Sequence, residues 1–281
     1  MKNKPFASII VPTFNEDPER LKNCLTALEN QTYPKKIYEV IVVDNGSNRD
    51  IQSIVKRFSQ ATISKENQPG SYLARNKGIS LAKGKIIAFT DSDCIPAKDW
   101  IEKGVNNLLK DSNIGLVGGR LEPIFKNPKK ITTAEFYDVI MHFDQKRFVE
   151  NKKFATTSNL FTFKHVFDKI GTFDAKLKSS GDVGWGQRVF AAGYKQRFAK
   201  DVIIYHPTRY TYSQLYIKNL RVAGGFYLHK NKSNPKEILT KIGSFKISNI
   251  QKFKIILLIA GLHSILMIER IRLKMGGKPR R

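Results

Sequence analysis

The sequence is poor in cysteine, in acidic residues and in long apolar runs. Its 281 residues include two cysteines, Cys24 and Cys94, and 24 acidic residues against 49 lysines and arginines, for a net charge of +25. Two cysteines at this spacing fit no metal site, and we interpret them as reduced core thiols of a cytosolic protein. The first apolar run breaks at Pro12, too early for a signal peptide.

The charge excess favours an anionic partner, which includes nucleic acid, phosphorylated small molecules and acidic membrane surfaces. The chain has no recognisable nucleic-acid-binding module, and its basic residues are spread along the sequence rather than grouped with aromatic residues. We therefore expect no nucleic-acid partner. Hydrophobic residues make up 41% of the chain, which is enough for the core of one large or two small α/β domains.

Strand and helix patterns alternate over the first hundred residues. Predicted strands fall at 6–12, 38–47, 61–64 and 85–90, with amphipathic helical segments between them. This βαβαβαβ order predicts the α/β fold class, with a doubly wound, mostly parallel central sheet and helices on both faces.

Polar side chains follow three of these predicted strands. Ligands of doubly wound sheets gather at the carboxyl ends of the strands, so polar residues there indicate a site rather than packing. The residues concerned are Thr13, Asn15, Asp44, Asn45, Asp91 and Asp93.

The triplet Asp91-Ser92-Asp93 is the strongest single indication of chemistry. Side chains alternate along a strand, so Asp91 and Asp93 point the same way and repel each other unless a cation lies nearby. Oxygen ligands suit Mg²⁺ or Mn²⁺, which commonly bridge to phosphates. The alternative is a solvated turn in which Asp93 caps the next helix.

Two further residues have competing interpretations. Asp44 is placed to accept hydrogen bonds from a ribose or a base, but "DNGS" also predicts an Asx turn before Gly46. Arg75 lies within a predicted helix, where it is placed to contact a phosphate or hold Asp91, or is simply a surface arginine.

The second half of the chain offers Asp182, Trp185 and His206. Asp182 begins a helix after a glycine-rich segment, so it is either a proton acceptor for a hydroxyl or a plain N-cap. Trp185 suits a sugar ring or a core equally well. His206 ends a late strand, so it is either a hydrogen-bonded surface or core residue or, if that strand end faces the acidic triplet, a third metal ligand.

Taken in this order, the residues resemble the family 2 glycosyltransferases, which are inverting enzymes of the GT-A fold. The resemblance spans residues 6 to 207, and its first half is specific as a set. The matching segments are "SIIVPTFNE", "VIVVDNGS", "ARNKGISLAKGKIIAFTDSDCIP", "TSNLFTFKHVFDKIGTFD" and "SSGDVGWGQRVFAAGY".

The resemblance implies a nucleotide-sugar donor and assigns residues to its binding. Asp91 and Asp93 correspond to the Asp-x-Asp motif around Ser92, with Asp93 favoured as the direct ligand of Mn²⁺ or Mg²⁺. His206 falls where some members carry a metal-binding histidine, and Asp182 of the Gly-Asp pair corresponds to the general base. The residues implied in donor binding are Pro12, Thr13, Asn15, Glu16, Asp44, Arg75, Asp91 and Ser92.

Departures from the family pattern refine the expected activity. Gly184 stands where relatives often carry an acid, and the Gln-x-x-Arg-Trp motif of processive synthases is absent. We therefore expect transfer of a single sugar, with a UDP-sugar favoured as donor. The expected acceptor is a hydroxyl of a glycan or lipid-linked molecule in surface polysaccharide or glycolipid synthesis. The alternatives are a nucleotidyltransferase, whose glycine-rich phosphate loop is lacking after the first strand, and a catalytically inactive binding relative.

The C-terminal region carries the longest uncharged apolar stretch, "IILLIAGLHSILMI" at 255–268. As a helix it would be about 21 Å long, shorter than the ~30 Å hydrocarbon layer. With basic flanks it predicts an interfacial membrane contact at the cytoplasmic, inner face of the cell membrane. The alternative is a helix docked on the catalytic domain, with its basic end solvated. We expect a nucleotide-sugar-binding half at 1–100, an acceptor-binding half at 101–215 and a basic helical extension at 216–281.

Overall fold

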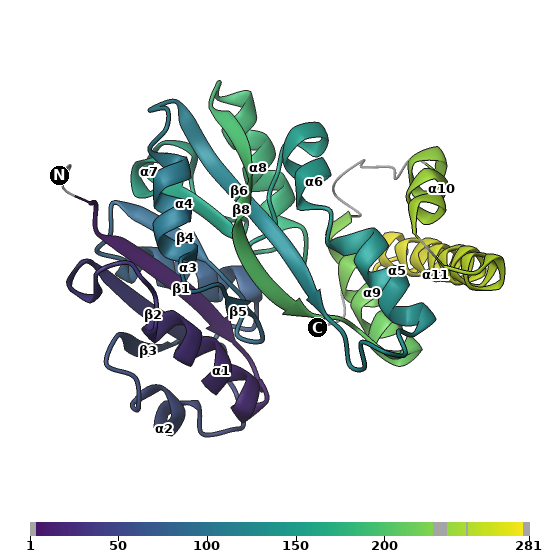
Figure 1. Cartoon of the computed structure of the whole chain (residues 1–281), viewed down its shortest axis with the longest axis horizontal. Helices are drawn as coiled ribbons and strands as arrows, with labels where there is room; N and C mark the ends of the chain where they lie inside the picture. Colours follow the sequence, from purple (N-terminus) through teal and green to yellow (C-terminus); the bar gives the residue numbers. More distant parts are fainter. Residues whose placement is uncertain (1–3, 227–234, 246, 278–281) are drawn as a thin grey trace. The chain divides into compact units, whose positions relative to one another are not determined.

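The computed structural model describes residues 4–226, 235–245 and 247–277 (Figure 1). Its strands are β1 (Ala7–Thr13), β2 (Tyr38–Asp44), β3 (Ala61–Lys65), β4 (Ile86–Phe89), β5 (Ile95–Pro96), β6 (Ile114–Ile124), β7 (Leu160–Phe163) and β8 (Lys195–Pro207). Its helices are α1 (Pro18–Glu29), α2 (Ile51–Val55), α3 (Ser71–Leu81), α4 (Trp100–Leu108), α5 (Thr133–His142), α6 (Gln145–Lys152), α7 (Lys164–Ile170), α8 (Gly181–Ala191), α9 (Tyr212–Phe226), α10 (Pro235–Ser244) and α11 (Asn249–Lys274), with a 3₁₀ turn at Lys35–Ile37.

One sheet organises the first part of the chain, in the order β3-β2-β1-β4-β7-β6-β8-β5. Strands β3, β2, β1 and β4 are parallel and are joined through α1, α2 and α3, which confirms the predicted βαβαβαβ order. Beyond β4 the sheet changes direction, because β7 runs antiparallel to both β4 and β6, and β5 runs antiparallel to β8. The sheet is therefore parallel in its amino-terminal half and mixed beyond it.

Strand β1 lies in the centre of the parallel half and is almost fully buried. Ile9, Ile10 and Val11 are inaccessible to solvent. Successive side chains of a strand point to opposite faces, so each face of β1 needs an apolar cover. On one face α3 comes close enough that a Cβ at Gly78 would overlap the Ile10 side chain. Helices accordingly flank the sheet on both faces, as Figure 1 shows.

The chain divides into two compact units. Unit 1 comprises the described parts of Met1–Glu122, Gln145–Lys176 and Gly181–His206, and it contains the sheet. Unit 2 comprises the described parts of Pro123–Asp144, Leu177–Ser180 and Pro207–Arg281, and it is mainly helical.

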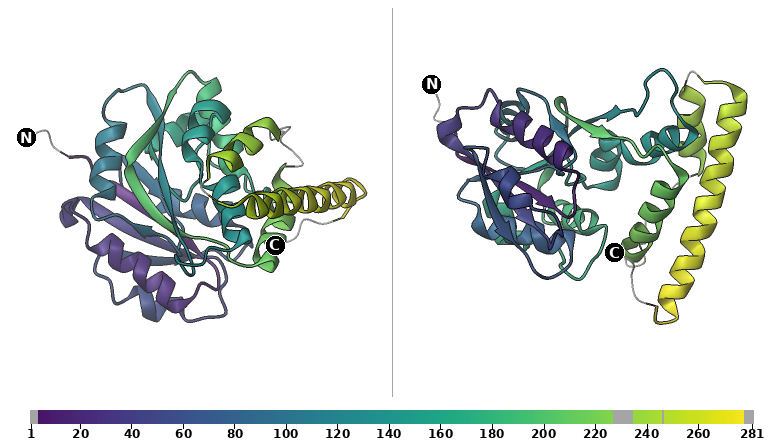
Figure 2. Two further views of the ribbon diagram at one scale, coloured as in Figure 1. Left: turned by 45° about the vertical axis from the view of Figure 1, so that its right-hand side comes forward. Right: turned by 90° about the horizontal axis from the view of Figure 1, so that it is seen from below.

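Unit 2 is built on helix packing around α5. Helix α11 runs beside α9, as the right-hand view of Figure 2 shows, and it also contacts α5 and α10. Its buried residues are spaced by seven, at Ile255, Leu262 and Glu269, so they lie on one face of the helix. The apolar residues buried in this packing are Ala134, Phe136, Tyr137, Ile140, Leu215, Ile238, Ile242, Ile255 and Leu262.

The 255–268 stretch is thus the middle of a 26-residue helix that begins at a capping box formed by Ser248 and Gln251. One face of α11 packs against α5, α9 and α10 within unit 2. Its other face exposes several large apolar side chains, including Leu257 and Ile268. Within the described ranges, no helix has the combination of length and apolarity that crossing a membrane requires.

Candidate active site

The site begins where the parallel strands end. The register pairs Thr13, the last residue of β1, with Asp44, the last residue of β2. The backbone N–H of Asn45 then donates to the carbonyl of Thr13 at 2.9 Å. Because parallel strands end at the same edge, the polar residues predicted for these two strand ends lie side by side.

The loop after β1 and the loop after β2 hold each other by hydrogen bonds. The backbone N–H of Asn15 donates to Ser47 Oγ at 2.8 Å, and the N–H of Asn48 donates to Asn15 Oδ1 at 2.7 Å. Asn15 has φ of 50°, in the left-handed region that asparagine tolerates better than most residues. The two loops therefore form one fixed edge.

Asp44 uses one oxygen in a turn and keeps the other available. Its Oδ1 accepts the N–H of Ser47 at 3.0 Å, three residues on, which is one residue further than in the predicted Asx turn. Its Oδ2 accepts no hydrogen bond from the described residues. Both interpretations of Asp44 are compatible, because the turn orients the carboxylate without consuming it. Thr13 Oγ1 is also buried without a partner in the described part of the chain.

The acidic triplet follows β4 and is surrounded by defined partners. Arg75 on α3 donates from Nη2 to Asp91 Oδ1 at 2.6 Å, which is the second of the roles considered for this arginine. Ser92 Oγ donates to Glu16 Oε2 at 3.2 Å. Burial, followed by the negative charge of Asp93, raises the pKa of the Glu16 carboxyl. Asp93 does not cap the next helix, whose N-cap residue is Asp99.

His206 reaches the acidic triplet through the pairing of β5 with β8. The register places Ile95 opposite Tyr205, so the antiparallel alternation brings the neighbouring residues Cys94 and His206 together. One ligand atom from each of Asp91, Asp93, Cys94 and His206 lies within 4.8 Å of the others. Two carboxylates, an imidazole and a thiol at this spacing fit a single divalent ion.

Cys94 belongs to this group although its spacing in the sequence fits no metal site. Its thiol lies 3.7 Å from Asp93 Oδ1, while Cys24 Sγ lies 3.6 Å from the carbonyl oxygen of Asp91. Both cysteines are buried and free, as predicted. Burial, followed by the nearby carboxylates, raises the pKa of both thiols. The position of Cys94 next to Asp93 is the sequence signal that could have identified it.

Asp182 lies in the first turn of α8 and is half-buried. Tyr72 Oη donates to its Oδ1 at 3.0 Å, and the Val183 N–H donates to the same oxygen at 3.0 Å. Burial raises the pKa of the Asp182 carboxyl, and the hydrogen bond from Tyr72 opposes this effect. A carboxylate with a raised pKa is a stronger proton acceptor than an ordinary aspartate.

A chain of contacts joins this carboxylate to the acidic triplet. The Arg75 guanidinium lies over the Tyr72 ring, 5.6 Å from its centroid, so Asp182, Tyr72, Arg75 and Asp91 are connected in sequence. Sequence reasoning missed Tyr72, which is separated from Asp182 by 110 positions. No local pattern marks such a pair.

The glycine-rich segment around Asp182 serves packing within the protein. A Cβ at Gly181 would lie 2.8 Å from the Tyr72 ring, so glycine allows α8 to approach that ring. Trp185 is completely buried and stacks on Phe167 with a centroid distance of 4.5 Å. Of its two proposed roles, Trp185 therefore has the core role and does not present a face to a sugar.

Known proteins show the same pattern in sequence. The family described as "Glycosyl transferase family 2" matches residues 8–178. Glycosyltransferase AglE of Haloferax volcanii is 42% identical over 226 residues, which cover 79% of this chain and 73% of AglE.

Solved structures show the same fold at lower identity. The mannosyltransferase PcManGT of Pyrobaculum calidifontis, solved with GDP-Man and Mn²⁺, matches with a TM-score of 0.62 and 20% identity over 99% of this chain and 77% of its own. S. aureus TarS 1-349 in complex with UDP matches with a TM-score of 0.56 and 18% identity over 89% of this chain and 69% of its own. From the extent of the family match and the identity to AglE, the chain belongs to glycosyl transferase family 2.

Proposed function

We propose that this glycosyltransferase moves one sugar, with inversion, from a nucleoside-diphosphate sugar to a hydroxyl of a glycan or lipid-linked acceptor in surface polysaccharide or glycolipid synthesis. The observation that supports this proposal is that unit 1 contains two groups of acidic side chains connected through Tyr72 and Arg75. One is the set of ligand atoms formed by Asp91, Asp93 and His206, and the other is the Asp182 carboxylate with its raised pKa.

Donor binding is proposed at the fixed edge formed by the loops after β1 and β2, within the first hundred residues. The free Oδ2 of Asp44 and the unpartnered Thr13 Oγ1 offer acceptors and a donor for a ribose or a base. A uridine nucleotide is the first choice of donor. The proposed donor-binding residues are Pro12, Thr13, Asn15, Glu16, Asp44, Arg75, Asp91 and Ser92.

The divalent ion is proposed to be Mn²⁺ or Mg²⁺, held by Asp91, Asp93 and His206. Bound there, such an ion neutralises negative charge on the donor diphosphate. Arg75 contributes independently, because its pairing with Asp91 fixes the orientation of that carboxylate. The Asp91 side chain remains one-third exposed and therefore accessible to a ligand.

Asp182 is the proposed general base. The acceptor hydroxyl oxygen bonds to the anomeric carbon while the bond from that carbon to the diphosphate oxygen breaks, and Asp182 takes the hydroxyl proton. The Tyr72 hydroxyl and the Val183 N–H hold Asp182 Oδ1, which fixes the orientation of the carboxylate. Acceptor binding is assigned to 101–215.

Membrane contact is proposed for unit 2, at the cytoplasmic, inner face of the cell membrane. The exposed face of α11 combines large apolar side chains with basic ends, and a helix of this kind favours an anionic lipid surface. The large apolar side chains exposed on α11 and just beyond its end are Ile250, Phe253, Ile256, Leu257, Met267, Ile268, Ile271 and Met275. Sedimentation with vesicles containing 30% anionic lipid, compared with neutral vesicles, checks this proposal, and equal sedimentation contradicts it.

The activity is tested by a donor screen on the full chain. UDP-, GDP- and dTDP-sugars are offered with Mn²⁺ and a panel of sugar and lipid-linked acceptors, and nucleoside-diphosphate release is followed together with product NMR. The expected result is one donor class, acceptor-dependent release and an inverted anomeric configuration. Retention of configuration would refute the role of Asp182, and release of inorganic pyrophosphate would instead indicate nucleotidyl transfer.

A further inference from the structure

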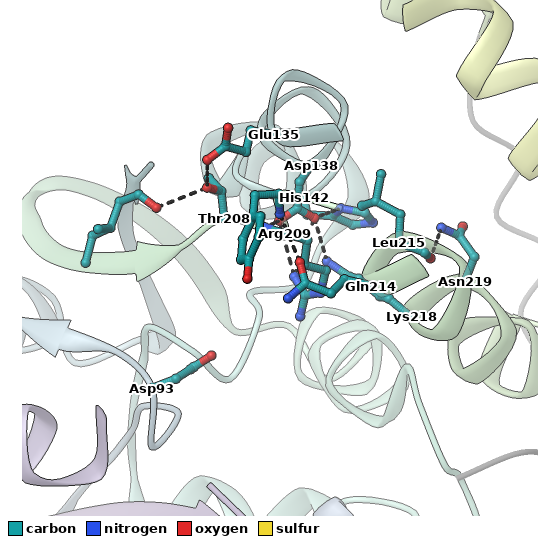
Figure 3. Close-up of polar contacts among 12 residues, drawn as sticks. Asp93, Glu135, Asp138, His142, Thr208, Arg209, Gln214, Leu215, Lys218 and Asn219 are labelled. Atoms are coloured by element: carbon teal, nitrogen blue, oxygen red, sulfur yellow. Dashed lines mark hydrogen bonds and ion pairs between the residues drawn. The ribbon is translucent and has the colours of Figure 1, made fainter. Parts of the chain in front are cut away.

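Unit 2 contains a cluster of charged side chains that the proposed reaction does not use. Asp138 on α5 is completely buried, and Figure 3 shows the polar side chains gathered around it. His142 Nδ1 lies 2.8 Å from Asp138 Oδ1, and Lys218 Nζ donates to the same oxygen at 3.2 Å. Arg209 donates to Oδ2 through its backbone N–H at 3.0 Å and through Nη1 at 3.3 Å.

The cluster carries more positive than negative charge. The single carboxylate of Asp138 faces Arg209 and Lys218, and Arg221 lies near enough to act on Lys218. Burial, followed by the charge of Arg209, lowers the pKa of the Lys218 ammonium to about 7. Burial and the charge of Lys218 lower the pKa of His142 to about 4, so this imidazole is neutral at pH 7. The site therefore favours an added negative charge.

The cluster also has hydrogen-bond donors left over. Within the described part of unit 2, the Lys218 ammonium has Asp138 as its only acceptor, and Arg209 Nε and Nη2 have none. The Gln214 side-chain amide likewise leaves its NH₂ group unused, because only its oxygen is engaged. Arg209, Gln214 and Lys218 are all partly exposed, so their donors can reach a ligand.

Helix periodicity places these donors together. Gln214 and Lys218 are four residues apart on α9 and share one face of the helix, and Arg209 precedes the same helix. On the same helix the exposed Ile217, three residues after Gln214, borders this face. A guanidinium and an ammonium are donors that suit a phosphate, and the exposed apolar side chain of Ile217 beside them suits a hydrocarbon chain attached to it.

We infer that Arg209, Gln214 and Lys218 form a binding site for the phosphate of a lipid-phosphate-linked acceptor. The inference rests on the proposed function, because it names the chemical class of the acceptor in that reaction. A purely structural role explains the cations around Asp138 less well, because the His142 ring and the Arg209 backbone N–H already form hydrogen bonds with this carboxylate. Two cations, Arg209 and Lys218, face this one carboxylate, so burying both adds desolvation cost and leaves positive charge in excess.

The test uses farnesyl monophosphate as the probe, with farnesol and inorganic phosphate as separate arms. Binding to the full chain is measured by calorimetry in EDTA, so that no divalent ion can hold phosphate at the acidic triplet. We expect the wild-type chain to bind farnesyl monophosphate and Lys218→Gln to bind it at least tenfold more weakly. Lys200→Gln, which removes an exposed lysine of β8 in unit 1, should bind like wild type.

The remaining arms separate the possible outcomes. Farnesol binding should not change in Lys218→Gln, and Lys218→Arg should restore at least half of the loss, which also covers a folding defect in the glutamine variant. Equal affinity of wild type and Lys218→Gln, or no binding of farnesyl monophosphate by wild type, overturns the site. Binding of inorganic phosphate as tightly as farnesyl monophosphate overturns the lipid source. Mn²⁺-dependent donor binding is measured in parallel, and its failure counts against the proposed function alone.

Discussion

Replacing Asp182 by asparagine isolates proton transfer from structure. The amide oxygen of asparagine can still accept from Tyr72 Oη and from the Val183 N–H, both 3.0 Å away in the native chain. The Tyr72 hydrogen bond then has a neutral acceptor, and this change costs about 1 kcal/mol of stability. The ability to accept a proton is lost completely. The substitution should therefore leave folding and donor binding nearly unchanged.

The expected effect on rate follows from the role of a general base. A positioned base contributes about 10²–10⁴-fold to the rate. At about 1.4 kcal/mol per factor of ten, this corresponds to about 3–6 kcal/mol of transition-state stabilisation. We expect kcat to fall within that range, while the dissociation constant of the donor changes less than threefold.

The assay measures nucleoside-diphosphate release under saturating donor, and calorimetry measures donor binding with Mn²⁺. Asp174→Asn is the matched control, because Asp174 is an exposed aspartate of unit 1 that only holds a nearby backbone N–H. If Asp182→Asn turned over within threefold of wild type, the assignment of the base would be wrong. A loss of donor binding equal to the loss of rate would place Asp182 in donor binding instead.

Three further predictions concern the pKa, the metal and the packing. Tyr72→Phe removes a hydrogen bond that lowers the pKa of Asp182, so that pKa should rise and the acidic limb of the kcat/KM profile should move to higher pH; an unchanged limb would separate Tyr72 from catalysis. EDTA should abolish donor binding, and added Mn²⁺ should restore it. Asp93→Asn should weaken donor binding at least tenfold. Donor binding that survives in EDTA would exclude the role of the metal. Leu262→Ala should cost about 2–5 kcal/mol in urea unfolding because this side chain is buried in unit 2, and Leu257→Ala, on the exposed face, should cost under about 0.5 kcal/mol; equal costs would contradict the docking of α11.

Local sequence patterns were sufficient to predict the parallel half of the sheet and the position of the acidic triplet. Both depend on short periodic patterns, because a buried strand is a continuous apolar run and a polar residue directly after it falls at the sheet edge. Asp44 and Asp91 could be placed at that edge without knowing any contact between them. The same local logic predicted that Cys24 and Cys94 are buried.

Contacts between distant segments depend on how the whole chain packs. The pairing of Ile95 with Tyr205 brings His206 to the acidic triplet, and no local pattern encodes a register between residues 110 positions apart. The choice of Asp91 as the partner of Arg75 likewise depends on how α3 packs beside the end of β4.

Packing also settled residues whose chemistry suits two roles. Trp185 suits a sugar face or a core, and its complete burial against Phe167 gives it the core role. The apolar stretch of α11 suits a membrane surface or a docked helix, and its face with Leu262 is buried in unit 2 while its face with Leu257 is exposed. Moving an apolar side chain out of water is favourable whether it enters a protein core or a lipid surface. The sequence therefore shows which side chains favour burial, and the packing of the chain shows which of them the protein itself buries.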